Sequence, residues 1–428
     1  MTCVRSDKIG SMSIISLTTT VNTAFFQPLH GLAGASPHAR LCPEFSDDAC
    51  LRLGVQRVLE SSESGRAFLQ EHGLRFDHTP GHSNYFAAFQ SERRLQLLRE
   101  VGLAVVGAAN PRLHDRLADI PELANYECFA MDGHWHKAAV HDARHEGTKM
   151  AVGHFYSLNL RTHTLRHLAA GQGWHEHDMS ALKRVKPKGL RQQVPQGKRV
   201  LAIYDKAGID FQYWKRCRQE CAVYFLSRLK AGLVFDWLES VAWDRSDARH
   251  HGVTEDRRVM AIGGHKLRII YYTDPRRGES YEFLTNELDL PPGVLAELYR
   301  RRWEAEKVFD QIKNKLKEKK AWATGLVAKE AQAQFIALTH NLLVLYEQAL
   351  EVRHGVTNLA EDQRRAQRTQ TEAQACAQAK QPLAALVLAT RRATQRSVKF
   401  IRWIRQSLHD HVAEALAVPR LRALYATL

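Results

Sequence analysis

Four residues in one segment have types and spacing that suit chemistry on a phosphate backbone. Tyr299, Arg302, Glu306 and Lys313 occur in LAELYRRRWEAEKVFDQIKNKLKEKK, spaced Tyr-x2-Arg-x3-Glu-x6-Lys. At about 100° per residue, their offsets fall within roughly 60° of one another on a helix. One helical stripe would carry a phenol, a guanidinium, a carboxylate and an ammonium. A single acid among cations suits a site that holds a metal ion beside a polyanion, and an ordinary basic amphipathic helix is the alternative.

Two aspartates are candidates to complete a set of three carboxylates with Glu306. YECFAMDGHW is typical of a short apolar strand ending at Asp132, and KRVLAIYDKAG of a buried strand ending at Asp205. If the two strands are neighbours, both carboxylates emerge at one sheet edge. Carboxylate oxygens are ligands that Mg²⁺ prefers. Asp210 is the alternative to Asp205, and Asp310 the alternative to Glu306.

The spacing resembles the Y-R-E-K signature of DDE transposases of the insertion-sequence 4 family, and AQAQFIALTHNLL is equally similar to that family. Gly133 after Asp132 also fits, as does Asp205-Lys206-Ala207, although the aromatic Phe211 comes slightly late. The resemblance implies an α/β, RNase H-like catalytic core interrupted by a β-rich insertion, with helical N- and C-terminal flanks. It implies a Mg²⁺-dependent enzyme, with Mn²⁺ as a substitute, in which Asp132, Asp205 and Glu306 are the catalytic metal ligands.

The same resemblance implies the reaction and the partners. Water attacks a phosphodiester at the element end and frees a 3′-OH, which then attacks target DNA by transesterification. The partners are double-stranded DNA, comprising the terminal inverted repeats and the target, and a second copy of the chain in a synaptic homodimer. Tyr299, Arg302 and Lys313 are expected to hold DNA beside the scissile bond, whereas Trp303 points away from the stripe and is expected to pack in the core.

An acid-free basic segment directly precedes the Asp205 strand. Its cations are Lys183, Arg184, Lys186, Lys188, Arg191, Lys198 and Arg199. We expect Lys183, Lys186 and Lys188 to bind phosphates that flank the scissile bond. A solvated basic loop is the alternative.

The histidines suggest another class of function. The pairs His134/His136, His175/His177 and His250/His251 could serve a metal-dependent nuclease or zinc hydrolase, but the sequence identifies no third ligand. We expect His134 and His136 to contact DNA or the acids near Asp132. A third hypothesis is a catalytically inactive, transposase-derived DNA-binding protein, although the presence of all three acids argues against it.

Composition agrees with a nucleic-acid partner. The 428 residues carry a formal net charge of +15, and 44% are hydrophobic, which is enough for a sizeable core. No run of 18 apolar residues predicts a membrane span. Seven scattered cysteines suit a reducing cytoplasm. The resemblance implies a bacterial protein associated with the nucleoid.

The patterning divides the chain into six regions. A flexible leader is expected over 1–40. A helical DNA-end-binding region covers 41–125, with Ser46 and Ser91 as helix caps. The expected RNase H-like core occupies 126–225 and 295–345, separated by a β-rich insertion over 226–294. A helical C-terminal region covers 346–428.

Overall fold

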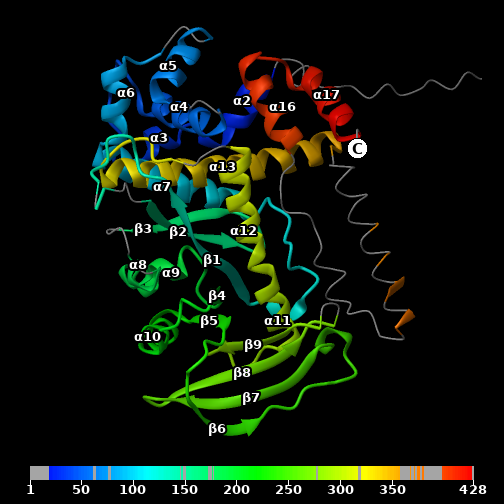
Figure 1. Ribbon diagram of the computed structural model, residues 1–428. Coiled ribbons are helices and arrows are strands. Elements are labelled where there is room, and N and C mark those ends of the chain that lie inside the picture. Colours follow the sequence, from blue (N-terminus) through cyan, green and yellow to red (C-terminus); the bar gives the residue numbers. More distant parts are fainter. Residues whose placement is uncertain are drawn as a thin grey trace, which may run out of the picture.

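The computed structural model is a mixed α/β protein built on one large sheet with helical flanks (Figure 1). The structure describes residues 19–426 apart from 61–63, 76–78, 145, 148–150, 172–175, 177, 276–277, 317–319, 357–366, 368–370, 372–373, 376–377 and 380–397. The described strands follow the order β3-β2-β1-β4-β5-β9-β8-β7-β6. No helix in the described part is long and apolar enough to cross a membrane.

The first five strands include the two that the patterning predicts at Asp132 and Asp205. They are β1 (Tyr126–His136), β2 (Val152–Asn159), β3 (Leu165–Ala170), β4 (Arg199–Ile203) and β5 (Val223–Arg228). β1 pairs antiparallel with β2 and parallel with β4, and β5 is parallel to β4. One expectation is wrong, because β1 does not end at Asp132. It continues to His136, since β2 pairs with it along its full second half.

The next four strands extend the same sheet. They are β6 (Phe235–Ser240), β7 (Val253–Ala261), β8 (His265–Thr273) and β9 (Ser280–Thr285). Antiparallel pairing of β9 with β5 places Leu226 opposite Thr285 and joins the two halves. The β-rich region expected over 226–294 is therefore continuous with the central strands.

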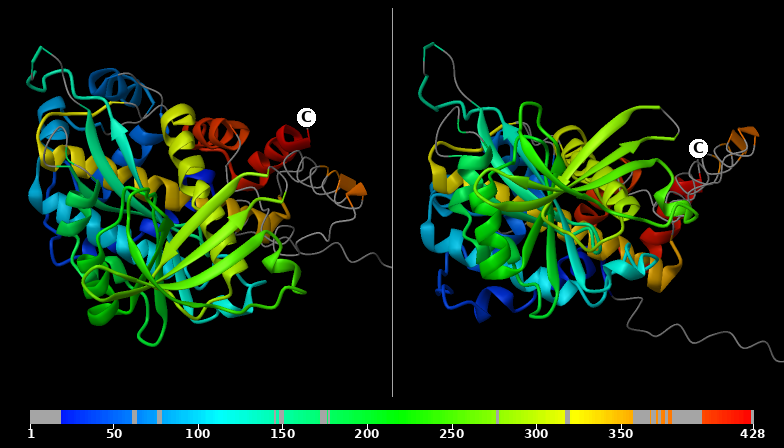
Figure 2. Two further views of the ribbon diagram at one scale, coloured as in Figure 1. Left: turned by 60° about the horizontal axis from the view of Figure 1, so that its bottom comes forward. Right: turned by 90° about the horizontal axis from the view of Figure 1, so that it is seen from below.

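Helices cover both faces of the sheet (Figure 2). Strand side chains alternate: Cys128 and Ala130 of β1 face one core, and Phe129 and Met131 face the other. The first core includes residues of α7 (Glu92–Ala109), α11 (Pro292–Arg301), α12 (Trp303–Asp310) and α13 (Leu326–His354). The second includes residues of α8 (Asp178–Arg184), α9 (Pro187–Arg191) and α10 (Phe211–Cys221). We call these the α12 face and the α10 face.

The N-terminal and C-terminal helices form one layer beside α13 (Figure 1). Its members are α2 (Val21–Phe26), α3 (Leu32–Ala35), α4 (Asp47–Leu59), α5 (Gly65–Gly73), α6 (His82–Phe89), α16 (Val398–His409) and α17 (Glu414–Ala426). The Val21 amide donates to the Val412 carbonyl at 3.0 Å, and the Glu414 amide donates to the Thr19 carbonyl at 2.9 Å. Residues far apart in sequence thus share one packing unit.

Two local predictions for this layer are confirmed, and one differs. Ser46 caps α4 by accepting from the Ala49 amide, and Ser91 caps α7 by accepting from the Arg94 amide. The expected flexible leader over 1–40 differs from the structure after its first part, because α2 begins at Val21 and Phe25 is fully buried. Residues 1–18 lie outside the described part.

Candidate active site

Two candidate acids lie at one level on neighbouring parallel strands. Ala130 of β1 is paired with Ile203 of β4, and Asp132 and Asp205 each lie two residues further along. Because side chains alternate, both follow the residues that face the α12 side of the sheet. Asp205 is exposed just after β4, whereas Asp132 lies within β1 at the point where its parallel partner ends. The strand register therefore brings these two carboxylates side by side at one sheet edge.

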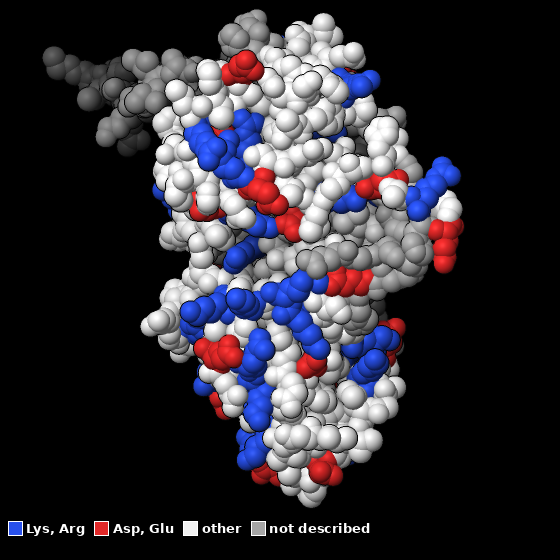
Figure 3. Space-filling view, turned by 90° about the vertical axis from the view of Figure 1, so that its left-hand side faces the viewer, with Lys and Arg blue, Asp and Glu red and all other residues white. Residues whose placement is uncertain are grey.

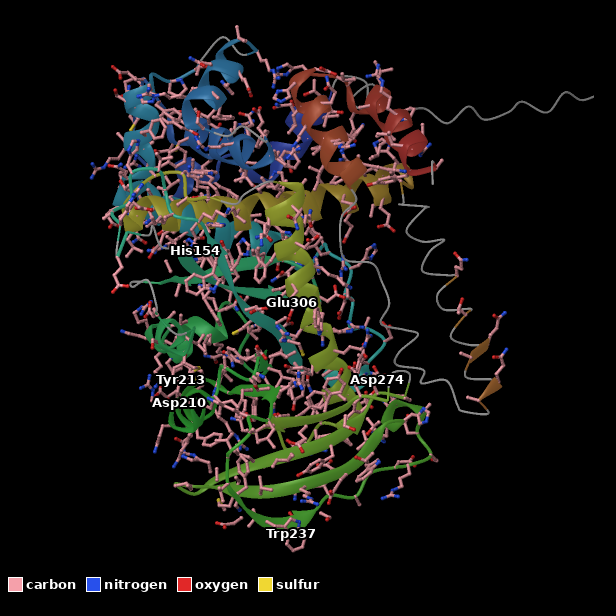
Figure 4. The ribbon with its side chains drawn as sticks, viewed as in Figure 1. His154, Asp210, Tyr213, Trp237, Asp274 and Glu306 are labelled. Atoms are coloured by element: carbon pink, nitrogen blue, oxygen red, sulfur yellow. The ribbon has the colours of Figure 1, made fainter. Side chains whose placement is uncertain are left out.

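The third candidate acid approaches from α12, which packs on β1. Glu306 lies in the middle of α12 (Figure 4). Its Oε1 accepts a hydrogen bond from Arg302 Nη2 at 2.7 Å, and Arg302 Nη1 donates to Asp132 Oδ2 at 3.0 Å. One guanidinium thus spans Asp132 and Glu306. The Arg302 side chain is 8% exposed, and the two acid side chains are 23% and 33% exposed, so the bridge is accessible mainly from the carboxylate side.

The helix that carries the stripe is less regular than the sequence predicts. The backbone tightens around Arg302. The Arg302 amide donates to the Tyr299 carbonyl, and the Ala305 amide donates to the Arg302 carbonyl, so each hydrogen bond spans three residues. This turn separates α11 from α12. The helix then widens into a π turn at Gln311–Lys315, and Lys313 lies exposed within it. Single π turns occur often at functional sites.

Trp303 lies in a different environment from the one expected. The expectation that Trp303 packs in the core is wrong, because 58% of its surface is exposed. Trp303 is thus an exposed aromatic ring next to the residue that binds both acids, and sequence periodicity gave no signal for it.

Tyr299 is buried beneath the acids. It is 6% exposed, and its ring lies 4.9 Å from the Phe283 ring. Burial raises the pKa of Tyr299 to about 12; the Arg302 guanidinium works in the opposite direction, and the Asp205 carboxylate adds to the rise. The phenol therefore stays protonated, close to both Arg302 and Asp205. A buried ring cannot stack on a displaced base without moving.

The alternative acids have other partners. Asp210 caps α10 by accepting from the Tyr213 amide at 2.9 Å, and it pairs with Lys183 at 2.5 Å. It lies by α10, across the sheet from Glu306 (Figure 4). Asp310 accepts from the Asn314 amide group at 2.6 Å. Local hydrogen bonding accounts for the positions of both residues.

The predicted basic DNA contacts lie on the other face. Lys183 belongs to α8, and Lys186 and Lys188 to the start of α9, whose buried side chains join the core of the α10 face. The acids instead follow residues of the α12 face. Lys183 pairs with Asp210 on this side of the sheet.

Four histidines form a buried row on the first three strands. His134 and His136 of β1, His154 of β2 and His167 of β3 have consecutive ring centroids 5.0, 5.0 and 5.3 Å apart. Burial lowers the pKa of all four: that of His134 to about 4, with Lys313 adding to the effect, and that of His167 to about 3. His134 also stacks on Phe309. Burial of His134 and His136 argues against direct contact with DNA, whereas their expected contact with the acids near Asp132 stays a prediction.

The histidine row does not support a zinc enzyme. The structure places His154 and His167 beside the pair His134/His136, for which the sequence identified no third ligand. Even so, no group of three His, Cys, Asp or Glu among the described residues is arranged to hold a metal ion. His250 Nδ1 bonds the Asp244 carbonyl at 2.7 Å. His175 and His177 lie outside the described residues.

The three acids also form no group arranged to hold a metal ion among the described residues. Arg302 lies between two of them, Asp132 and Glu306. Their chemistry nevertheless fits a hard divalent cation. Asp132, Asp205 and Glu306 offer only carboxylate oxygens, and Asp132 and Glu306 are close enough to share one cationic partner.

A known protein family matches part of the chain. Residues 132–342 match the family model described as "Transposase DDE domain". The matched segment starts at Asp132 and includes Asp205, Glu306 and the Tyr299–Lys313 stripe. A search of curated proteins found no match to the chain. The family match supports a DDE transposase, a class of enzymes that bind and cleave DNA and generally use divalent metal ions.

Proposed function

We propose that this chain is a transposase of the insertion-sequence 4 type, which cleaves DNA at the ends of its element and joins the freed ends to target DNA. In this proposal Asp132, Asp205 and Glu306 hold Mg²⁺, with Mn²⁺ as an accepted substitute. One observation carries the proposal: Arg302 bonds both Asp132 and Glu306 at the level where strand register brings Asp205 beside Asp132. The strand order β3-β2-β1-β4-β5 supports an RNase H-like core.

Bound divalent ions would supply activation of the attacking oxygen and stabilisation of the leaving oxygen. The side chains around the acids have separate tasks. Arg302 holds Asp132 and Glu306 in one orientation before DNA arrives, and a DNA phosphate offers its guanidinium a new partner. Lys313, exposed on the π turn, is suited to a neighbouring phosphate of the same strand.

Two aromatic residues complete the proposed DNA contact. The buried Tyr299 phenol is a proton donor between Arg302 and Asp205, suited to fix the position of a phosphate or of the guanidinium. The exposed Trp303 ring is the better candidate for stacking on a base that leaves the helix. The chain would act as a homodimer that pairs two element ends, the terminal inverted repeats being its specific DNA partner.

The test is cleavage of a labelled duplex that spans the boundary between the element and its flanking DNA. With Mg²⁺ or Mn²⁺ we expect a new 3′-OH at the boundary, followed by joined products when a plasmid target is added. Activity with Zn²⁺ alone would instead favour a histidine-dependent hydrolase. Tight binding of the boundary duplex without cleavage in any of these metals would favour an inactive, transposase-derived DNA-binding protein.

A further inference from the structure

Positive charge is concentrated in the segment that forms the α10 face. Residues 178–221 contain eleven Lys and Arg against four Asp and Glu, a net charge of +7 out of +15 for the whole chain. This segment is only about a tenth of the 428 residues. Of the three candidate acids this segment holds Asp205 alone, and the cation that bonds Asp132 and Glu306 is Arg302, outside the segment, so chemistry at the acids does not account for so much charge.

Part of this charge is used within the protein. Lys183 pairs with Asp210, Arg184 with Glu176, Lys198 with Glu127 and Arg199 with Asp289. Arg191 donates to the carbonyls of Cys221, Pro195 and Lys198. The Lys183 and Arg191 contacts tie α8 and α9 to the two ends of α10, so they organise the surface on which the other cations are presented.

Four further cations point outward from two adjacent helices. Lys186 and Lys188 of α9 are exposed, as are Lys215 and Arg216 of α10, and α9 packs against α10. Among the described residues, Arg216 of this group forms an ion pair with Glu220, one helical turn away, at 3.3 Å. Both side chains are more than half exposed. Such surface pairs are weak and exchange readily for a phosphate.

The surface between these cations is hollowed and polar. A hollow of about 480 Å³ beside α10 is lined by Lys183, Asp210, Gln212, Tyr213, Lys215, Arg216 and Gln219. Amide groups of exposed glutamines donate to phosphate oxygens as lysines do. Figure 3 shows Lys and Arg gathered across the middle and lower part of the side that includes α8, α9 and α10.

We propose that α9 and α10 form a second DNA-docking face, which binds the phosphate backbone of the target duplex while an element end lies at the acids. The buried residues of α9 and α10 pack on one side of the sheet, and those of α11 and α12, which precede and follow Arg302, pack on the other. We therefore assign the two groups of cations to different duplexes. The cations and amides contact backbone rather than bases, which suits a duplex of arbitrary sequence. This inference rests on the proposed function for the identity of the duplex.

The first experiment measures binding without chemistry. A labelled duplex of random sequence is titrated in EDTA at several salt concentrations with the full chain, with Lys215→Gln/Arg216→Gln and with Lys186→Gln/Lys188→Gln. Each pair should make the slope of log K against log salt shallower by nearly two units, or about 0.9 per phosphate contact. The matched control is Arg402→Gln/Arg420→Gln, which removes the same charge from exposed positions on α16 and α17. An unchanged slope in both α9 and α10 variants, or an equal change in the control, overturns the face.

The second experiment identifies the duplex. Joining of a pre-cleaved element end is measured against plasmid target concentration. The double variant Lys215→Gln/Arg216→Gln should raise the target concentration that gives half-maximal joining by at least about tenfold. If the variant instead weakens capture of the end and leaves the target dependence unchanged, the assignment to target DNA is overturned. A shallower salt slope with no joining by the unsubstituted chain would support the docking face while contradicting the proposed function.

Discussion

Arg302 donates a 3.0 Å hydrogen bond to Asp132, a residue 170 positions earlier in the chain. The same guanidinium donates to Glu306, and little of it is exposed, so solvent screens the bridge weakly. Two acids are thereby held together by a cation of the protein itself. A divalent ion would compete with Arg302 for the carboxylates, and a DNA phosphate would compete with the carboxylates for Arg302.

This competition predicts that Arg302→Gln tightens the binding of Mn²⁺ in the absence of DNA. The two carboxylates lose the cation that occupies them, and we expect a dissociation constant lower by roughly tenfold, or about 1.4 kcal/mol. Titration followed by the EPR signal of free Mn²⁺ measures this directly. Arg302→Lys keeps the charge and should remain close to the unsubstituted chain. Equal Mn²⁺ affinity in Arg302→Gln would show that the bridge does not oppose the metal.

Burial of Tyr299 predicts different outcomes for two substitutions. Tyr299→Phe keeps the packing on Phe283 and should leave thermal stability nearly unchanged while it slows cleavage of a pre-nicked element end. Tyr299→Ala leaves a cavity and should destabilise the fold by about 3–5 kcal/mol. Thermal unfolding and single-turnover cleavage separate the two effects. Normal cleavage by Tyr299→Phe would mean that the phenol only fills space.

Exposure of Trp303 predicts the reverse pattern. Trp303→Ala should leave stability almost unaffected, because the ring is more than half exposed. Loss of base stacking should weaken binding of a duplex with an unpaired base at the cleavage position by about 1–3 kcal/mol. Fluorescence anisotropy on this duplex and on a fully paired one provides the comparison. An equal loss on both substrates would assign Trp303 to a general contact instead.

The histidine row predicts a loss of stability in acid. Burial lowers the pKa of His154, and that of His167 to about 3, so the unfolded chain binds more protons than the folded one below about pH 6.5. The contribution of these neutral histidines to stability is therefore fully present above that pH. It falls as the pH drops toward 3, by up to about 1.4 kcal/mol per pH unit for each histidine. Urea unfolding at pH 5, 6 and 7 gives the free energy of unfolding at each pH. This free energy should change less with pH in His167→Gln than in the unsubstituted chain. The exposed His30→Gln is the matched control, and equal slopes in both variants would contradict this account.

The sequence predicted local elements well because local patterns determine them. Ser46 and Ser91 are recognisable caps, and apolar runs located the strand that carries Asp132 and the strand that precedes Asp205. The pairing of β9 with β5 and the layer that joins α2 to α16 depend on contacts between residues far apart, which no local pattern encodes.

The site shows the same division. Helical spacing located Glu306 and Arg302, but it did not reveal that Arg302 turns toward Asp132 rather than toward solvent. It also assumed a regular helix, so it did not predict the tight turn at Arg302 or the π turn after it, nor that Trp303 is exposed. The lysines of the basic segment were expected at the acids from their place in the chain, whereas the buried residues of α8 and α9, which carry or adjoin them, pack in the core of the α10 face.

The central claim is that Asp132, Asp205 and Glu306 act together in DNA cleavage. The most direct measurement is single-turnover cleavage of a pre-nicked element end in Mg²⁺ by Asp132→Ala, Asp205→Ala, Glu306→Ala and the helix-cap variant Asp210→Ala, with binding measured in parallel. We expect each of the first three to lose activity on the order of 10³-fold or more while binding DNA as tightly as before, since metal ligands act in chemistry and affinity comes mainly from cations. Asp210→Ala should lose only about 1 kcal/mol of stability and should still cleave. Cleavage by Asp205→Ala near the unsubstituted rate, together with loss of cleavage in Asp210→Ala, would contradict the assignment of the three acids.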